Sequence, residues 1–194
     1  SNNTGLGSNA LGANTTGTGN VAIGYTALTA NTTANYNVAV GRLALAANTT
    51  GNENTAVGNG ALSTNIDGDR SVAVGYNALA TQEPASNVDM YNVAVGHSAG
   101  AAVTTGVQNT LIGGLAGDAI TDADSNVAIG YASLTTNVLG SKSVAIGQGT
   151  LSDQNPDSAA DMNNVAVGFN AGASVSTGIQ NTFVGSLAGD ANTT

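Results

Sequence analysis

The sequence Asn-Val-Ala-Val-Gly at residues 92–96 decides the fold, because the chain repeats it along its whole length. The same five residues stand at 37–41 and 164–168, and Ile replaces the second Val at 20–24 and 126–130. The residues of a catalytic site occur once in a chain, whereas a sequence motif that recurs at fixed spacing marks a structural repeat. The repeat therefore predicts a solenoid of stacked coils.

The glycine that closes each copy serves as a marker for the period. The eleven marker glycines are Gly7, Gly24, Gly41, Gly58, Gly75, Gly96, Gly113, Gly130, Gly147, Gly168 and Gly185. The marker numbers rise in steps of 17, except for two steps of 21 that end at Gly96 and Gly168 and lie four coils apart. Because nothing interrupts this period, we expect residues 1–194 to form one elongated domain of eleven coils with no linker.

The composition excludes several classes of partner. The chain carries three basic and twelve acidic residues, has a formal net charge of −9 and contains no cysteine. It therefore lacks the basic footprint of a nucleic-acid or anionic-lipid binder and cannot form a disulfide framework. No apolar run is long enough to span a bilayer, so we expect no membrane insertion of this segment.

Apolar residues alternate within each copy of the phrase. The residue three places before the marker is always β-branched, the residue just before it is Val, Ile or Leu, and Ala lies between them in eight copies. Period two in such residues predicts a short strand. One coil is too small to fold alone, so we expect a parallel β-solenoid that rises about 4.8 Å per coil, or roughly 50 Å in total.

Both faces of this strand are apolar, and a strand of that kind is covered on both faces. We expect the Val and Ile side chains to pack into the coil's own core. The small Ala side chains would then face outward against another copy of the chain. This pattern predicts a homo-oligomer, a trimer or higher.

The second half of the coil shows a compensation in volume. Leu stands four residues after the marker in seven copies, and Gly stands there in the other four. With Gly100, Gly117 and Gly172 the polar residue three places further on becomes apolar, giving Val103, Ile120 and Val175. The departure is Gly189 in the last coil, which keeps the polar Asn192. Close packing of two positions that share one pocket predicts this exchange.

Two further columns have a polar or turn character. Asn stands four places before the marker in nine copies, with Ser71 and Ser143 in the other two, and we expect a side-chain ladder there. Six coils carry Gly ten places after the marker, where we expect a turn with positive φ. These residues are Gly17, Gly51, Gly68, Gly106, Gly140 and Gly178.

The phrase Asn-Val-Ala-[Val/Ile]-Gly, with Leu or Gly four places further on, resembles the YadA-like head repeats of trimeric autotransporter adhesins and similar repeats of phage tail fibres. The resemblance implies a left-handed parallel β-roll, with three chains packed around a common axis. It also implies an extracellular location, on a cell or virion surface, and attachment to a host surface, matrix or glycan.

The sequence offers no set of residues for catalysis. His97 is the only histidine, and its column, one place after the marker, varies so widely that we interpret it as exposed surface. No second titratable group accompanies it at a fixed spacing, so acid–base or nucleophilic chemistry lacks a partner. We therefore expect a non-enzyme with no catalytic residue, cofactor or resident metal.

Two other signals leave alternatives open. The sequence from Asp122 to Asp124 starts like a calcium-binding loop but lacks the Gly and Glu found later in such loops. Two interpretations stay open for these residues and for Asp67 and Asp69: a weak calcium contact, or carboxylates that are simply solvated in turns. Sequons at Asn14, Asn31 and Asn48 are candidate glycosylation sites, and the same residues also suit plain turns.

The two longer coils carry extra residues within 82–90 and 153–162. Insertions in a solenoid emerge on one face, often the binding face. We expect them to display a paired acidic ridge of candidate recognition residues, with plain spacer loops as the alternative. The residues are Glu83, Asp89, Asp157 and Asp161.

These observations favour a structural and adhesive segment of an extracellular fibre. An end-to-end filament subunit is the alternative. Ice binding comes third, because it requires the same Thr-x-Thr on every coil and the positions eight and nine places after the marker are irregular.

Overall fold

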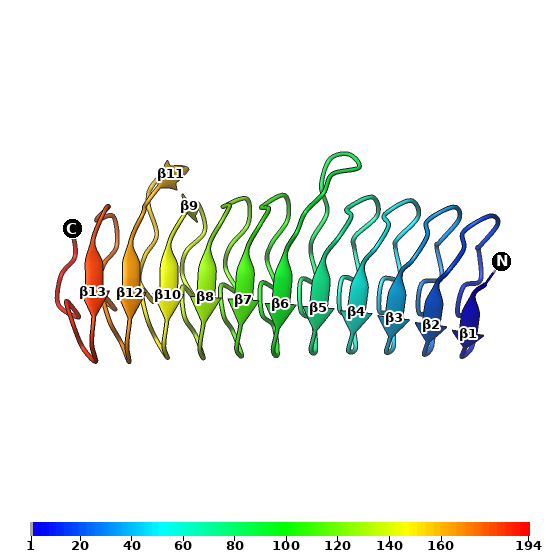
Figure 1. Cartoon of the computed structure of the whole chain (residues 1–194), viewed down its shortest axis with the longest axis horizontal. Coiled ribbons are helices and arrows are strands. Elements are labelled where there is room, and N and C mark those ends of the chain that lie inside the picture. Colours follow the sequence, from blue (N-terminus) through cyan, green and yellow to red (C-terminus); the bar gives the residue numbers. More distant parts are fainter. Residues whose placement is uncertain (1) are drawn as a thin grey trace.

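The computed structural model describes residues 2–194 and forms a rod of stacked coils (Figure 1). Eleven parallel strands make one continuous sheet in the order β1-β2-β3-β4-β5-β6-β7-β8-β10-β12-β13. The strands of this sheet are β1 (Thr4–Leu6), β2 (Val21–Ile23), β3 (Val38–Val40), β4 (Thr55–Val57), β5 (Val72–Val74), β6 (Val93–Val95), β7 (Thr110–Ile112), β8 (Val127–Ile129), β10 (Val144–Ile146), β12 (Val165–Val167) and β13 (Thr182–Val184). The predicted all-β parallel solenoid is confirmed.

The register follows the repeat even where the coil is longer. Ala39 pairs with Ala56 across a coil of ordinary length, and Ala73 pairs with Ala94 across the first longer coil. The extra residues form loops that protrude at the end of the coil where the strands begin (Figure 1). The second of these loops adds a small sheet of β9 (Gly140–Ser141) and β11 (Ala160–Asp161). Residues 2–194 contain no helix that could cross a membrane.

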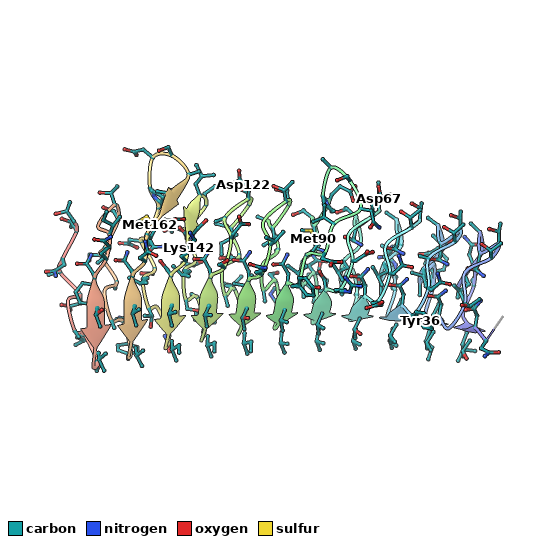
Figure 2. All side chains as sticks on the ribbon, turned by 45° about the horizontal axis from the view of Figure 1, so that its top comes forward. Tyr36, Asp67, Met90, Asp122, Lys142 and Met162 are labelled. Atoms are coloured by element: carbon teal, nitrogen blue, oxygen red, sulfur yellow. The ribbon has the colours of Figure 1, made fainter. Side chains whose placement is uncertain are left out.

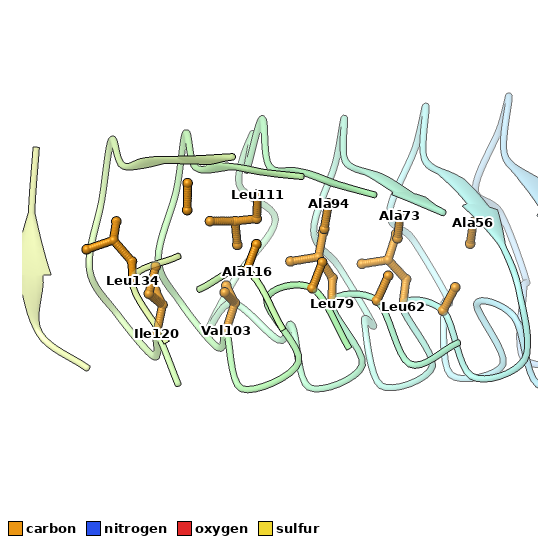
Figure 3. Close-up of a cluster of buried hydrophobic side chains, with 14 of the residues drawn as sticks. Ala56, Leu62, Ala73, Leu79, Ala94, Val103, Leu111, Ala116, Ile120 and Leu134 are labelled. Atoms are coloured by element: carbon orange, nitrogen blue, oxygen red, sulfur yellow. The ribbon is translucent and has the colours of Figure 1, made fainter. Parts of the chain in front are cut away.

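The orientation expected for the strand side chains is wrong. The central Ala of the strands is fully buried, as at Ala39, Ala73 and Ala94, whereas the flanking Val, Ile and Thr side chains lie on the outside of the sheet. The cause is the opposite wall of the coil, where Leu62 and Leu79 point inward with no exposed surface. Figure 3 shows these Leu side chains facing the strand Ala residues, which leaves room only for a methyl group.

The predicted exchange of volume is confirmed and involves a third position. Leu111 replaces the central Ala where two consecutive coils have Gly in place of the inward-pointing Leu, at Gly100 and Gly117. A Cβ added at Gly100 or Gly117 would lie 2.6 or 2.7 Å from a Leu111 methyl group. Val103 and Ile120 fill the remaining space with no exposed surface (Figure 3).

Phe183 makes the same exchange in the last coil. Its ring would lie 2.9 Å from a Cβ added at Gly172 and 2.2 Å from one added at Gly189. This contact explains why Gly189 needs no apolar partner three residues later, which the sequence pattern left unexplained. The interior volume of a coil is therefore shared among three positions, and any one of them can supply it.

The marker glycines are fixed by the backbone and by the neighbouring coil. Their φ angles lie between 129° and 144°, a region that side chains avoid. A Cβ added at Gly58 would also lie 2.3 Å from the carbonyl oxygen of Gly75 in the next coil. The next coil therefore leaves no room for a side chain at the marker.

Each coil also contains non-glycine residues in the left-handed region. In the coil around Gly58 these are Glu53 (φ 58°) and Leu62 (φ 49°). Left-handed backbone costs an L-residue roughly 1–2 kcal/mol. Burial of the Leu62 side chain offsets that cost, because a fully buried Leu contributes about 1.5–3 kcal/mol.

The glycines expected to form left-handed turns have a different role. None of Gly17, Gly51, Gly68, Gly106, Gly140 and Gly178 has a positive φ. Glycine occupies these positions because side-chain amides and a backbone carbonyl lie too close to leave room for a Cβ. A Cβ at Gly51 would lie 2.5 Å both from Oδ1 of Asn48 and from the carbonyl oxygen of Gly68.

Substituting Gly58→Ala should destabilise the chain by at least about 1–3 kcal/mol, the cost of a strained backbone alone, and the clash with Gly75 adds to it. Chemical denaturation measures this loss. Gly114→Ala is the control, because its added methyl group would lie at an ordinary 3.5 Å from Tyr131. Equal stability of the two variants would contradict the assigned role of the marker.

Leu111→Ala should cost about 2–5 kcal/mol, because neither neighbouring Gly can fill the cavity. Adding Gly117→Leu and Ile120→Asn recreates the pattern of the other coils and should recover most of that loss in a denaturation experiment. If the triple variant is no more stable than the single one, the three positions do not share one pocket.

Candidate functional site

The outer surface of the eleven-stranded sheet carries a row of exposed and half-exposed apolar side chains, and we call it the outer sheet face. It consists of the residues one and three places before each marker, all of them Val, Ile, Thr or Leu. Val95, Ile112 and Ile146 each keep 37% of their surface exposed. The face runs unbroken along the rod because every strand pairs in register with the next.

Aromatic side chains border this face on both sides. One place after the marker, Tyr25, Tyr76, Tyr131 and Phe169 are each about half exposed. Tyr36 and Tyr91 stand five places before the marker, and Figure 2 shows Tyr36 at the level of the strands. Contiguous exposed apolar surface of this kind marks an interaction site.

His97 lies on the same border and is exposed, as its variable column predicted. Its ring stacks on Tyr76 with centroids 5.1 Å apart and planes 17° apart. Tyr76 and His97, one coil apart in this border column, therefore contact each other directly.

A ladder of asparagines holds the coils at their spacing, as predicted. The N–H of Asn37 donates to Oδ1 of Asn20 at 2.9 Å, and Nδ2 of Asn37 donates to the carbonyl of Gly51 at 2.8 Å. The same pair of bonds recurs at Asn54 and Asn109. Each amide thus satisfies backbone groups inside the rod that would otherwise be unpaired.

The ladder changes at the two Ser positions. Ser71 is too short to reach the next coil, and Gln82 fills the space. The Gln82 amide donates to the Ser71 hydroxyl at 3.0 Å and accepts from Nδ2 of Asn92 at 2.9 Å. Gln154 likewise joins Ser143 to Asn164, because its Oε1 accepts from the Ser143 hydroxyl at 3.1 Å and from Nδ2 of Asn164 at 2.9 Å. In both longer coils, a Gln side chain therefore completes the ladder at the point where Ser replaces Asn. The sequence interpretation missed this relation between the Ser and Gln positions.

The sequon asparagines belong to a second internal ladder. Asn31 and Asn48 are fully buried, and their Nδ2 atoms donate to the carbonyls of Ala34 and Gly51. Asn14 is partly buried and accepts from Asn31 at 2.6 Å. A sugar on the Asn31 or Asn48 amide would break these bonds and needs space that the coil interior occupies, so the folded chain does not present these two sites for glycosylation.

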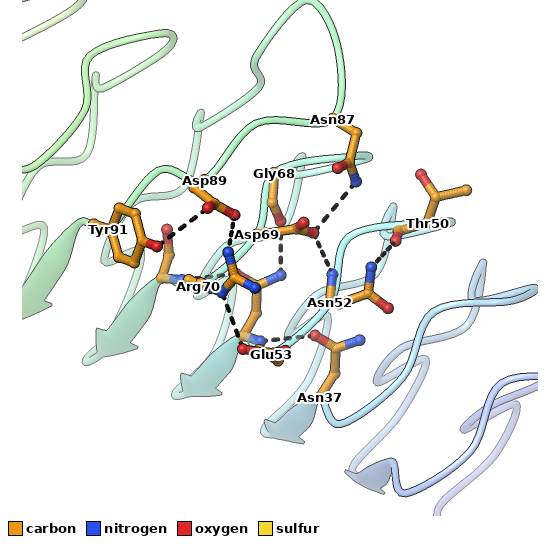
Figure 4. A network of polar contacts seen from close by, with 12 residues as sticks. Asn37, Thr50, Asn52, Glu53, Gly68, Asp69, Arg70, Asn87, Asp89 and Tyr91 are labelled. Atoms are coloured by element: carbon orange, nitrogen blue, oxygen red, sulfur yellow. Dashed lines mark hydrogen bonds and ion pairs between the residues drawn. The ribbon is translucent and has the colours of Figure 1, made fainter.

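The first long loop is held by an ion-pair network (Figure 4). Arg70 pairs with Asp89 of the loop and with Glu53 of the preceding coil, at 3.0 Å in the second case. The Tyr91 hydroxyl donates to Asp89 at 3.1 Å. Hydrogen bonds to Glu53 and Asp89, together with the negative charge of both carboxylates, raise the pKa of Arg70 above its ordinary value.

The second long loop repeats this arrangement with Lys142, which pairs with Asp161 at 2.6 Å. Lys142 lies four coils after Arg70, and Asp161 lies four coils after Asp89. The expected acidic ridge is therefore neutralised at two of its four members. Asp157 is exposed at the tip of its loop, and Glu83 is partly buried at the base of the other.

Burial raises the pKa of Glu83, and the nearby Asp67 carboxylate raises it further, while the hydrogen bond from the Ile66 N–H at 2.6 Å acts in the opposite direction. A folded-state pKa above the unfolded value means that the folded chain binds the proton more tightly. The free energy of unfolding then falls as pH rises through the titration of this group.

The other turn carboxylates bond to the chain itself. Oδ1 of Asp124 accepts from the Val107 N–H at 2.8 Å, and Oδ1 of Asp69 accepts from the Asn52 N–H. Asp67 and Asp122 lie at the edge of the rod away from the strands (Figure 2) and accept from Thr hydroxyls. Within residues 2–194, no group of three or more metal-ligating side chains and no pocket is found.

Comparison of the chain with protein-family models, with curated proteins and with solved structures finds no match.

Replacing Glu83 with Gln keeps an acceptor for Ile66 and removes the ionisable group. The variant should be more stable than the parent at pH 7, and the two should converge near pH 3, where Glu83 is neutral in both folded and unfolded chains. Urea midpoints at the two pH values measure this. Glu53→Gln is the control and should lower stability at pH 7, because it weakens the pair with Arg70. A Glu83→Gln variant less stable than the parent at pH 7 would contradict the conclusion that burial raises the pKa of Glu83.

Proposed function

We propose that the chain is a non-catalytic, rigid segment of an extracellular fibre, a shaft or head that projects from a cell or virion and attaches to surfaces. The observation that carries the proposal is the outer sheet face, an apolar strip that runs the whole length of a rigid rod. A rod whose coils each contact only their neighbours has no enclosed interior for a substrate and instead offers repeated surface.

We further propose that several copies, three in a closed assembly, cover the outer sheet face. With eleven coils of about 4.8 Å and about 3.3 Å per residue, the three-residue strands alone cover roughly 500 Å², and the border residues on both sides enlarge the face. A stable interface needs about 800 Å² from each partner. The resemblance of the repeat to YadA-like heads and tail-fibre repeats supports the same arrangement.

The adhesive part of the proposal lies in the two long loops. They protrude beyond the other turns, at the opposite end of the coil from the marker glycines (Figure 1). Their exposed residues, 85–88 and 157–159, do not contribute to the core and are free to vary with a target.

The double variant Val95→Lys, Ile112→Lys should convert the assembly to monomers, because two charges would lie in the covered face. Sedimentation measures the mass, and circular dichroism checks that the fold is unchanged. Thr105→Lys with Ser158→Lys, at positions exposed elsewhere, is the matched control and should leave the mass unaltered. A folded variant whose mass equals that of the parent assembly would exclude the outer sheet face as the interface.

Deleting residues 85–88 and 157–160 should leave the rod folded and assembled, because the register across both coils is set by the strands. Binding to arrays of matrix proteins and glycans should be lost. If a protein or glycan binds the parent and the deletion variant equally well, the loops are spacers.

A further inference from the structure

The two long loops begin with the same irregular contact between coils. In ordinary coils, the N–H eight places after the marker donates to the backbone carbonyl of the matching residue in the next coil, as Thr32 does at 3.3 Å. Where the next coil is one of the two long ones, a side-chain oxygen takes the place of that carbonyl. Oε2 of Glu83 accepts from the Ile66 N–H at 2.6 Å. Four coils later, Oδ1 of Asn155 accepts from the Val138 N–H at 3.3 Å.

The side chains at these two contacts differ in charge. The first loop uses a carboxylate, Glu83, and the residue next to the donating N–H is Asp67. The second loop uses the neutral amide of Asn155, and the residue next to its donor is Leu139. Asp67 is held in place, because the Thr50 hydroxyl donates to its Oδ1. The first loop therefore begins with two neighbouring carboxylates, whereas the matching positions of the second loop are uncharged.

The charge that acts on Glu83 comes from the preceding coil. Asp67 lies on that side, whereas Thr104, whose carbonyl accepts from the Glu83 N–H at 3.0 Å, is the uncharged neighbour in the following coil. Burial raises the pKa of Glu83, the bond from Ile66 opposes this rise, and the charge of Asp67 adds to it. A released loop exposes Glu83 to water and removes these effects, so the closed loop holds the proton more tightly. Lowering the pH therefore favours closure, and raising the pH through this titration favours release.

Other charged groups hold the far end of the first loop. Arg70 pairs with Asp89 there, and the Asp69 carboxylate accepts from Nδ2 of Asn87 at 3.4 Å. These contacts keep the far end attached when the contact of Glu83 opens. The movement is therefore confined to the base of the loop.

We propose that the contact between Glu83 and the Ile66 N–H is a pH-sensitive clasp at the base of the first long loop. It is closed in mild acid and is released more often at neutral pH, where the Glu83 and Asp67 carboxylates repel each other. The second loop, closed by Asn155, stays unchanged over the same range. The clasp does not depend on what the loop binds, and its effect on attachment rests on the function proposed above.

Amide hydrogen exchange of the full chain tests the clasp, because release frees the Ile66 N–H to exchange. Protection factors, corrected for the intrinsic effect of pH, are measured by NMR from pH 7 down to pH 4.5, the ordinary pKa of a Glu carboxyl. The buffer contains EDTA, so that no metal ion bridges the carboxylates. The protection of Ile66 should rise as the pH falls. The protection of Val138, which is bonded to Asn155, should stay constant and serves as the control within the same chain.

Two variants isolate the carboxylate pair. Glu83→Gln keeps the acceptor and removes the charge, so Ile66 should already have at pH 7 the protection that the parent reaches in acid, with no further change on acidification. Asp67→Asn keeps an acceptor for the Thr50 hydroxyl and should weaken the pH response. Protection of Ile66 that is constant or falls on acidification of the parent would overturn the clasp. The same response in Glu83→Gln as in the parent would also overturn it.

Binding of the parent to the arrays of matrix proteins and glycans, measured at both ends of the pH range, separates the clasp from the adhesive function. A pH response at Ile66 in a chain that binds no surface at either pH would support the clasp and contradict the adhesive function. Binding to a surface together with constant protection of Ile66 would support the adhesive function and contradict the clasp.

Discussion

The close approach of consecutive coils at the marker glycine is the constraint on which the rest of the structure depends. For the ten markers from Gly7 to Gly168, a carbonyl oxygen of the next coil lies 2.3 to 2.6 Å from where a Cβ would stand. This spacing allows the three-residue strands to pair and brings each Asn amide within reach of the next coil. Every other residue column is then repeated at a fixed interval along the rod.

The narrow coil determines which residues lie inside. The strand and the opposite wall of the coil are so close that only one large side chain fits between them. The opposite wall supplies that side chain, as Leu62 or Leu79. The strand can then place only Ala inside, unless the Leu is replaced by Gly, as around Leu111. The larger Val and Ile side chains therefore face outward, and the apolar outer sheet face is a consequence of how the interior is filled.

That consequence links the fold to the proposed function. A chain with so few apolar residues stabilises itself by ladders of backbone and amide hydrogen bonds, and much of its Val and Ile remains on the surface. Exposed β-branched residues on a regular sheet are an aggregation hazard unless they are covered. The proposed closed assembly through this face would remove the hazard and would produce a stiffer rod. All acidic residues lie outside the strands of the eleven-stranded sheet, and Asp67 and Asp122 lie at the opposite edge of the rod (Figure 2), where negative charge opposes non-specific association.

The sequence predicted the period, the strands, their register, the Asn ladder and the exchange between Gly100 and Val103. Each of these depends on residues that recur at a fixed spacing. The inward direction of Ala could not be predicted from the strand alone, because a three-residue strand that is apolar on both faces fits either way round. Leu62 on the opposite wall decides it, and that contact is visible only in three dimensions. The ion pairs of Arg70 and Lys142 with the loops were also missed, although both cations and both loops recur at the same interval of four coils.

The mass of the unmodified chain in solution tests the central claim most directly. The account predicts that sedimentation equilibrium at micromolar concentration gives about three times the 18.7 kDa of one chain, because the outer sheet face must be covered. A folded species of 18.7 kDa that persists as concentration rises would contradict it, since the apolar face would then be stable in water.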